Sequence, residues 1–335
     1  MKMLLFDFRE SERDFFERNE FKDFDITFIE EPLNEMSQLS EEQLNETDVI
    51  SVFINSSLTE EVISKFKNLR MIATRSTGID HIDVKYCSQH NIAVFNVEQY
   101  GQNAVAQYTI GLIISIVRNM IPAYFAMQKN LINHADYEGR DLKKLTLGLV
   151  GGGAIGGSVA KIAHFIGMRV LVYSYKKSEE LKKIVEFVEL DELLRESDVI
   201  SLHIPATTET HHFLSYEAFG KMKEGVYIIN TARGELVDVV ALYENLINGK
   251  VKGAALDVLE CENITFSGDI LPDIKNSNSK CLTSALVTEK LMGCKNVILT
   301  PHIAYNTKEA VETLLETSFN SIKDYAKGMN TNRVC

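Results

Sequence analysis

The sequence predicts an α/β fold made of two doubly wound parallel-sheet domains with a cleft between them. The first observation is that short apolar runs alternate with amphipathic, helix-like stretches along nearly the whole chain. This alternation is typical of parallel sheets covered by helices on both faces. The second is a glycine-rich loop that opens a new series of strands only at Gly151, so another domain must precede it. A length of 335 residues suits two domains of about 150 residues each.

Five apolar runs in the first part of the chain predict buried strands, because parallel strands covered on both faces are continuously apolar. Helix-like stretches, such as residues 11–19 and 58–69, separate them. The predicted strands cover residues 2–8, 25–30, 48–54, 70–76 and 92–97.

A second and longer series of strands follows, at residues 145–151, 169–174, 187–190, 198–205, 226–232, 253–259 and 296–301. After it only the helical stretch 307–328 remains, which is too short for a domain and which we expect to pack on the first one. We therefore place one domain at residues 1–100 and 303–335, and the other at residues 101–302. The chain then crosses between them near residues 99–102 and 300–303, beside the candidate site.

Two further stretches need an interpretation. Residues 99–117 carry no charge and are about long enough to cross a bilayer. Polar side chains, Gln102 and Gln107 among them, interrupt the stretch, so a helix buried between domains or subunits is the better interpretation. Residues 263–284 mix Pro, Gly, Asn and Ser, which predicts an insertion or surface loop beside the site.

Composition and charge exclude several classes of protein. A hydrophobic share of 45% and a charged share of 24% argue against disorder and fibres. The net charge of -12 disfavours a nucleic-acid partner. The five cysteines have no metal-binding spacing, so we expect no metal and free thiols, with Cys261 as a small apolar filler. The N-terminus is strand-like and unlike a signal peptide, which favours the cytoplasm.

The glycine-rich loop has the spacing of a dinucleotide site, with Gly151, Gly153 and Gly156 between a strand and a helix. The first glycine permits the tight turn, the second lets a pyrophosphate approach the backbone, and the third lets helix and strand pack closely. Ala154 and Ile155 start the helix whose N-terminus would face the phosphates. A purely structural turn would explain one glycine better than three. The second domain is therefore predicted to be a Rossmann domain that binds NAD(P).

The residue that closes the second strand of this domain bears on cofactor choice. An acidic residue usually stands there and binds the ribose hydroxyls of NAD, but this chain has Ser174, followed by Tyr175, Lys176 and Lys177. A carboxylate that would repel a 2′-phosphate is absent, and cations are present. We therefore favour NADP(H) or dual specificity. The alternative is that the lysines are ordinary surface charge and NAD(H) binds without its acidic anchor.

Three polar residues, Arg233, Glu262 and His302, stand at or just beyond the ends of strand-like apolar runs. Singly, such an arginine is usually a surface ion pair and such a histidine a structural residue. Jointly, at strand ends of one nucleotide-binding sheet, they lie where these folds place ligands. Reduction of a 2-oxo acid needs a cation for the carboxylate, an acid for the carbonyl oxygen and a group that keeps this acid protonated. Arg233, His302 and Glu262 fit these roles in that order.

The motifs GLVGGGAIG, HIP, INTARGELVD, GAALDVLECE and TPHIAY occur in this order and resemble the NAD(P)-dependent D-2-hydroxyacid dehydrogenase family over essentially the whole chain. Through TRSTGIDHID, VRNM and LVYSYKKS the chain is similar to its D-lactate dehydrogenases, particularly the vancomycin-resistance type. The resemblance implies a flavodoxin-like substrate domain, a homodimer with residues 108–117 and their flanks in contact, and Arg233, Glu262 and His302 as the catalytic trio. It selects Glu262 over Glu260, because the family's acid follows Asp257 by five residues.

The resemblance also implies residues around the cofactor and the substrate. Asp257 would hold the nicotinamide carboxamide, and Thr77 and Gly78 would give backbone N–H groups to the substrate carboxylate. Residues implied to line the cofactor are Ile204, Pro205, Thr210, Thr231 and Ala232. Aromatic candidates near the substrate are Phe53, Tyr100 and Tyr305.

The chain departs from the family at Gly101, Gln102 and Gln107, where relatives tend to have Ser, Pro and an acid. These changes lie at the hinge and leave the trio intact. The leading hypothesis is a D-lactate dehydrogenase, which reduces pyruvate or a similarly small 2-oxo acid. The alternatives are a dehydrogenase for branched or aromatic 2-oxo acids and, in another class, a dinucleotide-sensing binding protein.

Overall fold

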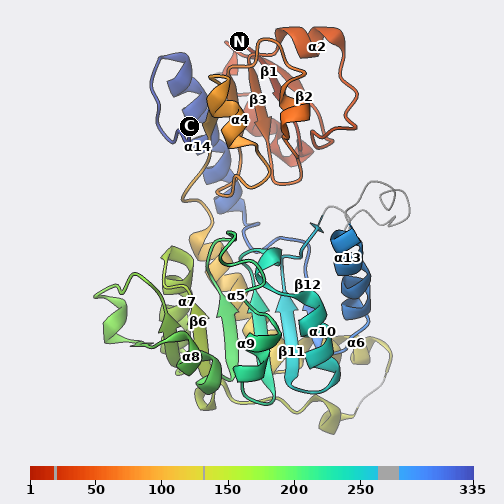
Figure 1. Cartoon of the computed structure of the whole chain (residues 1–335), viewed down its shortest axis with the longest axis vertical. Helices are drawn as coiled ribbons and strands as arrows, with labels where there is room; N and C mark the ends of the chain where they lie inside the picture. Colours follow the sequence, from red (N-terminus) through yellow and green to blue (C-terminus); the bar gives the residue numbers. More distant parts are fainter. Residues whose placement is uncertain (19–20, 131–132, 263–278) are drawn as a thin grey trace. The chain divides into compact units, whose positions relative to one another are not determined.

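The computed structural model describes residues 1–18, 21–130, 133–262 and 279–335. The chain forms two compact units (Figure 1), and each is described by itself. Unit 1 comprises Met1–Gly101 and Thr307–Cys335, and unit 2 comprises Gln102–Asn306. Both are parallel α/β structures, which confirms the predicted fold class.

Unit 1 contains a five-stranded parallel sheet in the order β2-β1-β3-β4-β5. This is the flavodoxin-like order, as predicted. The strands are β1 Lys2–Leu5, β2 Asp25–Phe28, β3 Val49–Val52, β4 Met71–Thr74 and β5 Ala93–Phe95. The helices within the described residues are η1 Glu10–Glu12, α1 Arg13–Phe16, α2 Glu41–Glu46, α3 Glu60–Ile63, α4 Val84–Gln89 and α14 Lys308–Ala326.

The strands of unit 1 send alternate side chains into two cores. Leu4 and Ile50 pack in one core with α3 and α4, while Met3 and Val49 pack in the other with α1 and α14. Helix α14 begins at Thr307, whose side chain accepts a hydrogen bond from the backbone N–H of Ala310. Its Leu315, Phe319 and Ile322 belong to the second core, so this helix completes the first unit.

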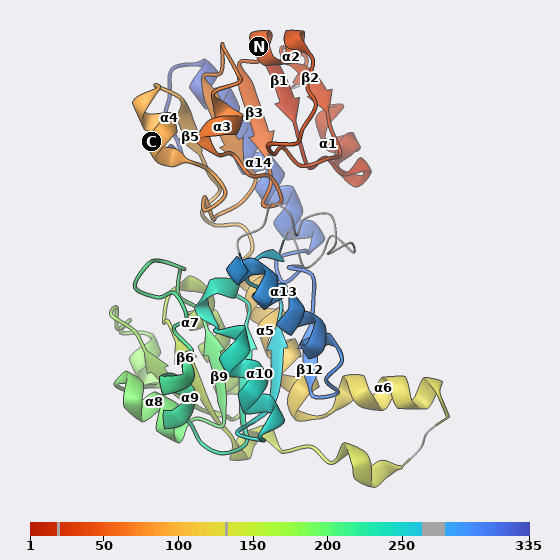
Figure 2. The same cartoon turned by 45° about the vertical axis from the view of Figure 1, so that its right-hand side comes forward.

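Unit 2 contains a seven-stranded parallel sheet in the order β12-β11-β10-β9-β6-β7-β8 (Figure 2). The chain order reverses between β6 and β9, which is the switch point where doubly wound sheets bind ligands. The strands are β6 Thr146–Val150, β7 Arg169–Tyr173, β8 Glu186–Phe187, β9 Val199–Leu202, β10 Val226–Asn230, β11 Val251–Leu256 and β12 Val297–Leu299.

Helices cover both faces of this sheet. On one face α5 (Gln102–Val117) and α7 (Ala154–Phe165) pack on alternate strand side chains. The other face carries α8 (Leu190–Glu196), α9 (Tyr216–Lys221), α10 (Val239–Ile247) and α13 (Ser279–Met292). The other helices among the described residues of the unit are α6 Met120–Gln128, η3 His134–Tyr137, η4 Leu142–Lys144, η5 Leu181–Lys183 and η6 Gly234–Leu236.

The uncharged stretch at residues 99–117 becomes α5, whose apolar side chains are mostly buried in the core of unit 2. Within the described residues, no helix alone has the length and apolar character to cross a membrane, and α5 with α6 passes that test only as a pair bent by 65°. Helix α6, by contrast, carries a run of exposed apolar side chains: Met120, Ile121, Tyr124, Phe125 and Met127.

One prediction about the end of unit 2 was wrong, and a second was wrong for the last residues that it covers. Cys261 and Cys281 form a disulfide, so only Cys87, Cys294 and Cys335 are free thiols. They pair because the chain brings the segment after β11 to the start of α13, and sequence spacing carries no signal for such pairing. Of the predicted surface loop, residues 263–278 lie outside the described residues, whereas Ser279 already starts helix α13.

Candidate active site

The three predicted catalytic residues follow neighbouring strands. Arg233 comes after β10, Glu262 after β11 and His302 after β12, and Asn230, Leu256 and Leu299 pair in register across these strands. Because the strands are parallel, their carboxyl ends lie at one edge of the sheet. The conformation of the loop that follows each strand then determines the direction of its side chain.

Asp257 organises the turn that carries His302. Its buried carboxylate accepts hydrogen bonds from the hydroxyl of Thr300 at 2.6 Å and from the backbone N–H groups of Ile303 and Ala304 at 3.0 and 2.8 Å. Burial raises the pKa of Asp257, and these hydrogen bonds oppose the rise. His302 itself has a φ of 52°, a left-handed backbone conformation that its surroundings must hold. The structure therefore gives Asp257 a positioning contact beside its predicted cofactor contact.

Glu262 and His302 are in direct contact. Nδ1 of His302 lies 2.9 Å from Oε2 of Glu262, and Oε1 of Glu262 accepts the backbone N–H of Leu259 at 2.9 Å. Both side chains are about one-quarter exposed. With Nδ1–H donated to the carboxylate, the other ring nitrogen, Nε2, is the one that can exchange a proton with a ligand. The ring of Tyr305 lies edge-on to the imidazole, with 6.4 Å between centroids.

Arg233 stands on a loop whose course is fixed by Asn230. The side-chain amide of Asn230 donates to the carbonyl of Arg233 at 2.7 Å, and its oxygen accepts the N–H of Ala232 at 3.0 Å. The next residue, Gly234, lies against the segment after β11, because a Cβ there would be 2.0 Å from the carbonyl carbon of Leu259. This contact joins the loop of Arg233 to the segment that carries Glu262.

The glycine-rich loop after β6 has the shape that a diphosphate requires. Gly151 has a φ of 107°, and a Cβ there would lie 2.3 Å from the carbonyl oxygen of His203. A Cβ at Gly156 would lie 2.0 Å from the carbonyl oxygen of Gly151, whereas none of the described atoms comes within 4 Å of one at Gly153. The first and third glycines thus permit close packing, and the second leaves room at the N-terminus of α7. The described residues fit a dinucleotide.

The other predicted cofactor residues lie on the ends of strands around this loop. Ser174 follows β7, and its Oγ would be 3.2 Å from a Cβ at Gly152, while the hydroxyl donates to the carbonyl of Lys176. Ile204, Pro205 and Thr210 lie on the loop after β9, and Ala154 and Ile155 begin α7. The hydroxyl of Thr210 bonds the carbonyl of Pro205 at 2.8 Å.

Thr231, which the resemblance places beside the cofactor, directs its hydroxyl toward α5. It is buried and lies 2.8 Å from the hydroxyl of Thr109 on α5. The next residue, Ala232, is held by its hydrogen bonds to Asn230 and Arg233. The contact of Thr231 with a cofactor stays a prediction.

The predicted substrate residues of unit 1 lie on the loops that follow three neighbouring strands. Thr77 and Gly78 follow β4, where the hydroxyl of Thr77 donates to the carbonyl of Val97 at 2.7 Å. Tyr100 ends the loop after β5, and Phe53 is buried after β3, with its backbone N–H bonded to Asp7. Their relation to the trio stays a prediction.

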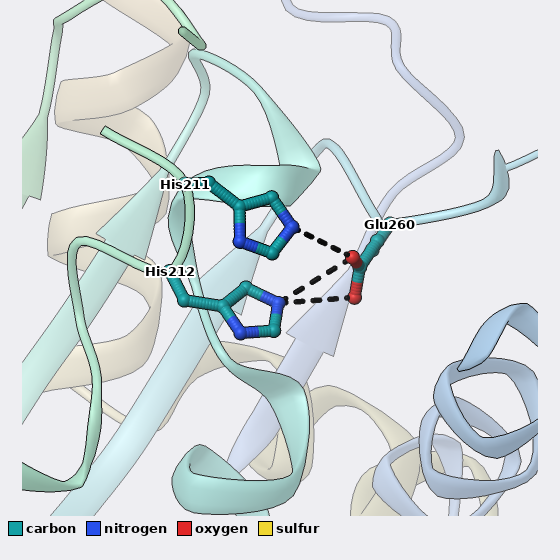
Figure 3. Close-up of side chains that lie close together, drawn as sticks. All are labelled: His211, His212 and Glu260. Atoms are coloured by element: carbon teal, nitrogen blue, oxygen red, sulfur yellow. Dashed lines mark hydrogen bonds and ion pairs between the residues drawn. The ribbon is translucent and has the colours of Figure 1, made fainter. Parts of the chain in front are cut away.

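Sequence reasoning missed a cluster formed by His211, His212 and Glu260 (Figure 3). From the sequence, Glu260 is only the alternative to Glu262 as the acidic member of the catalytic trio. The structure brings Glu260 within 3.6 Å of the first histidine and 3.4 Å of the second. The only sequence signal was the pair of adjacent histidines on the loop after β9.

A second missed residue, His203, makes stability depend on pH. Burial lowers its pKa to about 4, and its Nε2 lies 2.9 Å from the hydroxyl of Ser201. In the unfolded chain the imidazole of His203 therefore binds a proton below about pH 6.5. In the folded chain it stays neutral down to about pH 4. We expect the free energy of unfolding to fall over this interval, by up to about 3 kcal/mol from this group.

Urea titrations between pH 4 and 7 measure this effect in the wild type and in His203→Gln. The slope attributable to this histidine should vanish in the variant and persist in His164→Gln, which removes an exposed histidine of the same unit. Equal slopes in all three proteins would contradict the assignment.

A doubly wound sheet, a glycine loop shaped for a diphosphate, and a histidine paired with a carboxylate define a dinucleotide-dependent oxidoreductase. A family model described as D-isomer specific 2-hydroxyacid dehydrogenase, NAD binding domain, matches residues 110–304. The chain belongs to this family, as predicted, and is an NAD-dependent D-2-hydroxyacid dehydrogenase.

Relatives with different substrates resemble the chain about equally. A D-lactate dehydrogenase from Aquifex aeolicus, solved with NAD and lactic acid, is 37% identical, with a TM-score of 0.86 over 97% of this chain and 96% of that one. A hydroxypyruvate reductase from Thermotoga maritima is 37% identical over 79% of this chain and 80% of its own length. An aromatic 2-oxoacid reductase from Clostridium sporogenes is 35% identical over 86% of each chain.

Proposed function

We propose that the protein is a D-lactate dehydrogenase, which reversibly reduces pyruvate, or a similarly small 2-oxo acid, to the D-2-hydroxy acid. The observation that carries this proposal is the 2.9 Å contact between His302 and Glu262 at the strand edge where Arg233 also stands. This arrangement supplies an acid–base group, its partner and a cation for the substrate. The lactic acid in the Aquifex aeolicus structure supports a small substrate.

Each side chain of the trio then has one task. Arg233 binds the substrate carboxylate through its planar guanidinium and polarises the neighbouring carbonyl. His302 gives a proton from Nε2 to the carbonyl oxygen during reduction and takes it back during oxidation. Glu262 orients the imidazole through Nδ1 and stabilises its cationic form. When bound, the dinucleotide supplies the hydride.

The cofactor would lie over the loop after β6 and the loops after β7 and β9. Gly153 and the N-terminus of α7 would hold the diphosphate, and Ser174 the ribose. We infer that NADPH is accepted at least as well as NADH, because Ser174 and Lys176 replace the usual repulsive carboxylate. The NAD in the Aquifex aeolicus structure favours the alternative, NAD(H).

An assay of kcat/KM over a panel of 2-oxo acids with each cofactor tests these proposals together. The panel should include pyruvate, hydroxypyruvate, a branched and an aromatic 2-oxo acid. We expect pyruvate to give the largest value and NADPH to give at least the value of NADH. A clear NADH preference would contradict the cofactor inference alone. Dinucleotide binding without turnover of any 2-oxo acid would favour a sensor.

A larger substrate is the second candidate, and Tyr305 is the observation that favours it. Its ring stands beside His302, where it could stack on an aromatic substrate as well as narrow the site to a methyl group. The aromatic 2-oxoacid reductase among the relatives supports this alternative. If phenylpyruvate exceeds pyruvate in kcat/KM, the smaller substrate is wrong.

Glu262, rather than Glu260, is proposed to act on His302, and two isosteric variants separate them. In Glu262→Gln the imidazolium loses a stabilising charge, so the alkaline limit of pyruvate reduction should move to lower pH and kcat should fall by about 10- to 100-fold. Glu260→Gln should keep the wild-type pH profile. The pH dependence of kcat/KM measures both, and the reverse result would mean that Glu260 is the partner.

We further propose a homodimer in the cytoplasm. The predicted contact at residues 108–117 is mostly buried in unit 2, so the exposed apolar side chains of α6 support the dimer better. Sedimentation as a monomer at micromolar concentration would contradict the homodimer.

The disulfide bears on the proposed location in the cytoplasm. It weakens the argument for a reducing compartment, so cell fractionation is the test of localisation.

A further inference from the structure

The cluster of His211, His212 and Glu260 lies on two loops outside the trio. The histidines belong to the loop after β9, and Glu260 to the segment after β11 (Figure 3). One ligand atom from each residue lies within 4.8 Å of the other two. The histidine rings are stacked, with centroids 4.0 Å apart and an interplanar angle of 26°, and both turn a ring nitrogen toward the carboxylate.

The distances match those between ligands of a small tetrahedral cation. Nε2 of His211 lies 3.6 Å, and Nε2 of His212 3.4 Å, from Oε1 of Glu260. Ligands bound to Zn²⁺ at about 2.0–2.1 Å with tetrahedral angles are about 3.3–3.4 Å apart. Both separations are longer than a good hydrogen bond, so an ion pair alone uses this geometry poorly.

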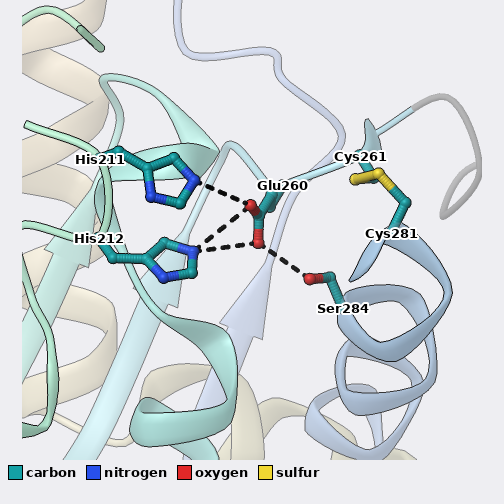
Figure 4. Close-up of a disulfide and its surroundings, with 6 residues drawn as sticks. All are labelled: His211, His212, Glu260, Cys261, Cys281 and Ser284. Carbon is teal, nitrogen blue, oxygen red and sulfur yellow. Dashed lines mark hydrogen bonds and ion pairs between the residues drawn. A yellow bond between two sulfur atoms is a disulfide. The ribbon is translucent and has the colours of Figure 1, made fainter. Parts of the chain in front are cut away.

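The ligand atoms are also held in place by the surrounding chain (Figure 4). The hydroxyl of Ser284 on α13 donates to Oε2 of Glu260 at 2.9 Å, and the adjacent Cys261 is tied to α13 by its disulfide. His212 has a φ of 50°, and its N–H bonds the carbonyl of Glu235 at 2.7 Å. Such conformations persist only where the surroundings fix them, and they concentrate at functional sites.

The charge around the cluster favours a cation. Glu260 is only 15% exposed in its side chain, and Asp238 places a second carboxylate oxygen 3.8 Å from Nδ1 of His212. A carboxylate behind a metal-binding histidine orients its ring and strengthens it as a ligand. His211 is half-exposed, which leaves a path for the ion and for a water as fourth ligand.

We propose that His211, His212 and Glu260 bind one divalent transition-metal ion, Zn²⁺ in the first instance. Two imidazole nitrogens and one carboxylate oxygen are a ligand set that suits Zn²⁺ better than Mg²⁺ or Ca²⁺, which prefer oxygen ligands alone. The ion would join the loop after β9, which carries predicted cofactor residues, to the segment after β11, which carries Glu262. All three ligands belong to the part of the chain that the structure describes.

Calorimetric titration of chelator-treated protein with ZnCl₂ tests the site directly. The wild type should bind one equivalent, and His212→Gln and Glu260→Gln should each bind at least about tenfold more weakly. His164→Gln is the matched control, and its binding should equal that of the wild type. A rise in Tm of about 3 °C or more with excess Zn²⁺ should occur in the wild type and the control only.

Titration with Co²⁺ identifies the ligands by their visible spectrum. A spectrum of nitrogen and oxygen ligation, lost in Glu260→Gln, supports the site. Strong near-ultraviolet bands of thiolate ligation would overturn it, because they would assign the ion to the free cysteines. The proposal is also overturned if both ligand variants bind Zn²⁺ as the wild type does, or if no protein binds it. Tm without metal shows that each variant folds.

Discussion

Replacing His302 by asparagine is expected to lower kcat by about 10²- to 10⁴-fold, both for pyruvate reduction and for oxidation of the D-2-hydroxy acid. Asparagine keeps a hydrogen-bond donor for Glu262, which now bonds Nδ1 at 2.9 Å, but has no group that titrates near neutrality. The turn should survive, because Asp257 holds it through the backbone of the two residues that follow. Steady-state kinetics measures the loss.

The control for this variant is dinucleotide binding, followed by the fluorescence of NADH or NADPH, which should change little. Tm should also stay close to that of the wild type. If kcat falls less than tenfold while binding and Tm are unchanged, His302 is not the acid, and another proton donor must be sought.

Replacing Arg233 by lysine is expected to lower kcat/KM for pyruvate by about 100-fold, although the charge is kept. A guanidinium presents two parallel N–H groups to a carboxylate, whereas an ammonium acts as a point charge. Loss of one hydrogen bond to a charged group costs about 1.5–3 kcal/mol, which corresponds to roughly 10- to 150-fold. Initial rates against pyruvate concentration, with saturating cofactor, measure it.

Arg195→Lys is the matched control for the loss at Arg233, because Arg195 is an exposed arginine of α8 in the same unit. It should leave kcat/KM unchanged. A loss that appears only in kcat, with KM unaltered, would mean that Arg233 contributes to the chemical step and not to substrate binding.

The sheets could be predicted because buried parallel strands are continuous apolar runs. Where a strand is short or its apolar run is interrupted, its predicted bounds are less accurate. Strand β8 at the sheet edge comprises only Glu186–Phe187, while the predicted run covered 187–190, whose Val188 and Leu190 pack against the core beyond the strand. Strand β11 starts at Val251, two residues before the predicted run, because exposed Lys252 interrupts the apolar pattern.

The site could be predicted only as far as strand ends and motifs specify it. The resemblance to the family, whose acid follows the aspartate by five residues, selected Glu262, which contacts His302. Nothing nearby in sequence indicated the partners of Glu260. These come from a loop about 50 residues away, and the disulfide partner of Cys261 comes from α13. Contacts of this kind depend on tertiary packing, which no local pattern encodes.

The disulfide also bears on how this enzyme could diversify. It holds the Cα atoms of Cys261 and Cys281 5.6 Å apart across a sequence separation of 20. Glu262 is the first residue of the loop that this bond closes, but its Oε1 is anchored outside the loop, by the backbone N–H of Leu259 at 2.9 Å. Doubling the length of the loop beyond Glu262 costs only about 0.6 kcal/mol of closure entropy. We expect insertions and deletions there to be tolerated. Evolution could therefore vary this segment freely while the acid–base pair stays unchanged.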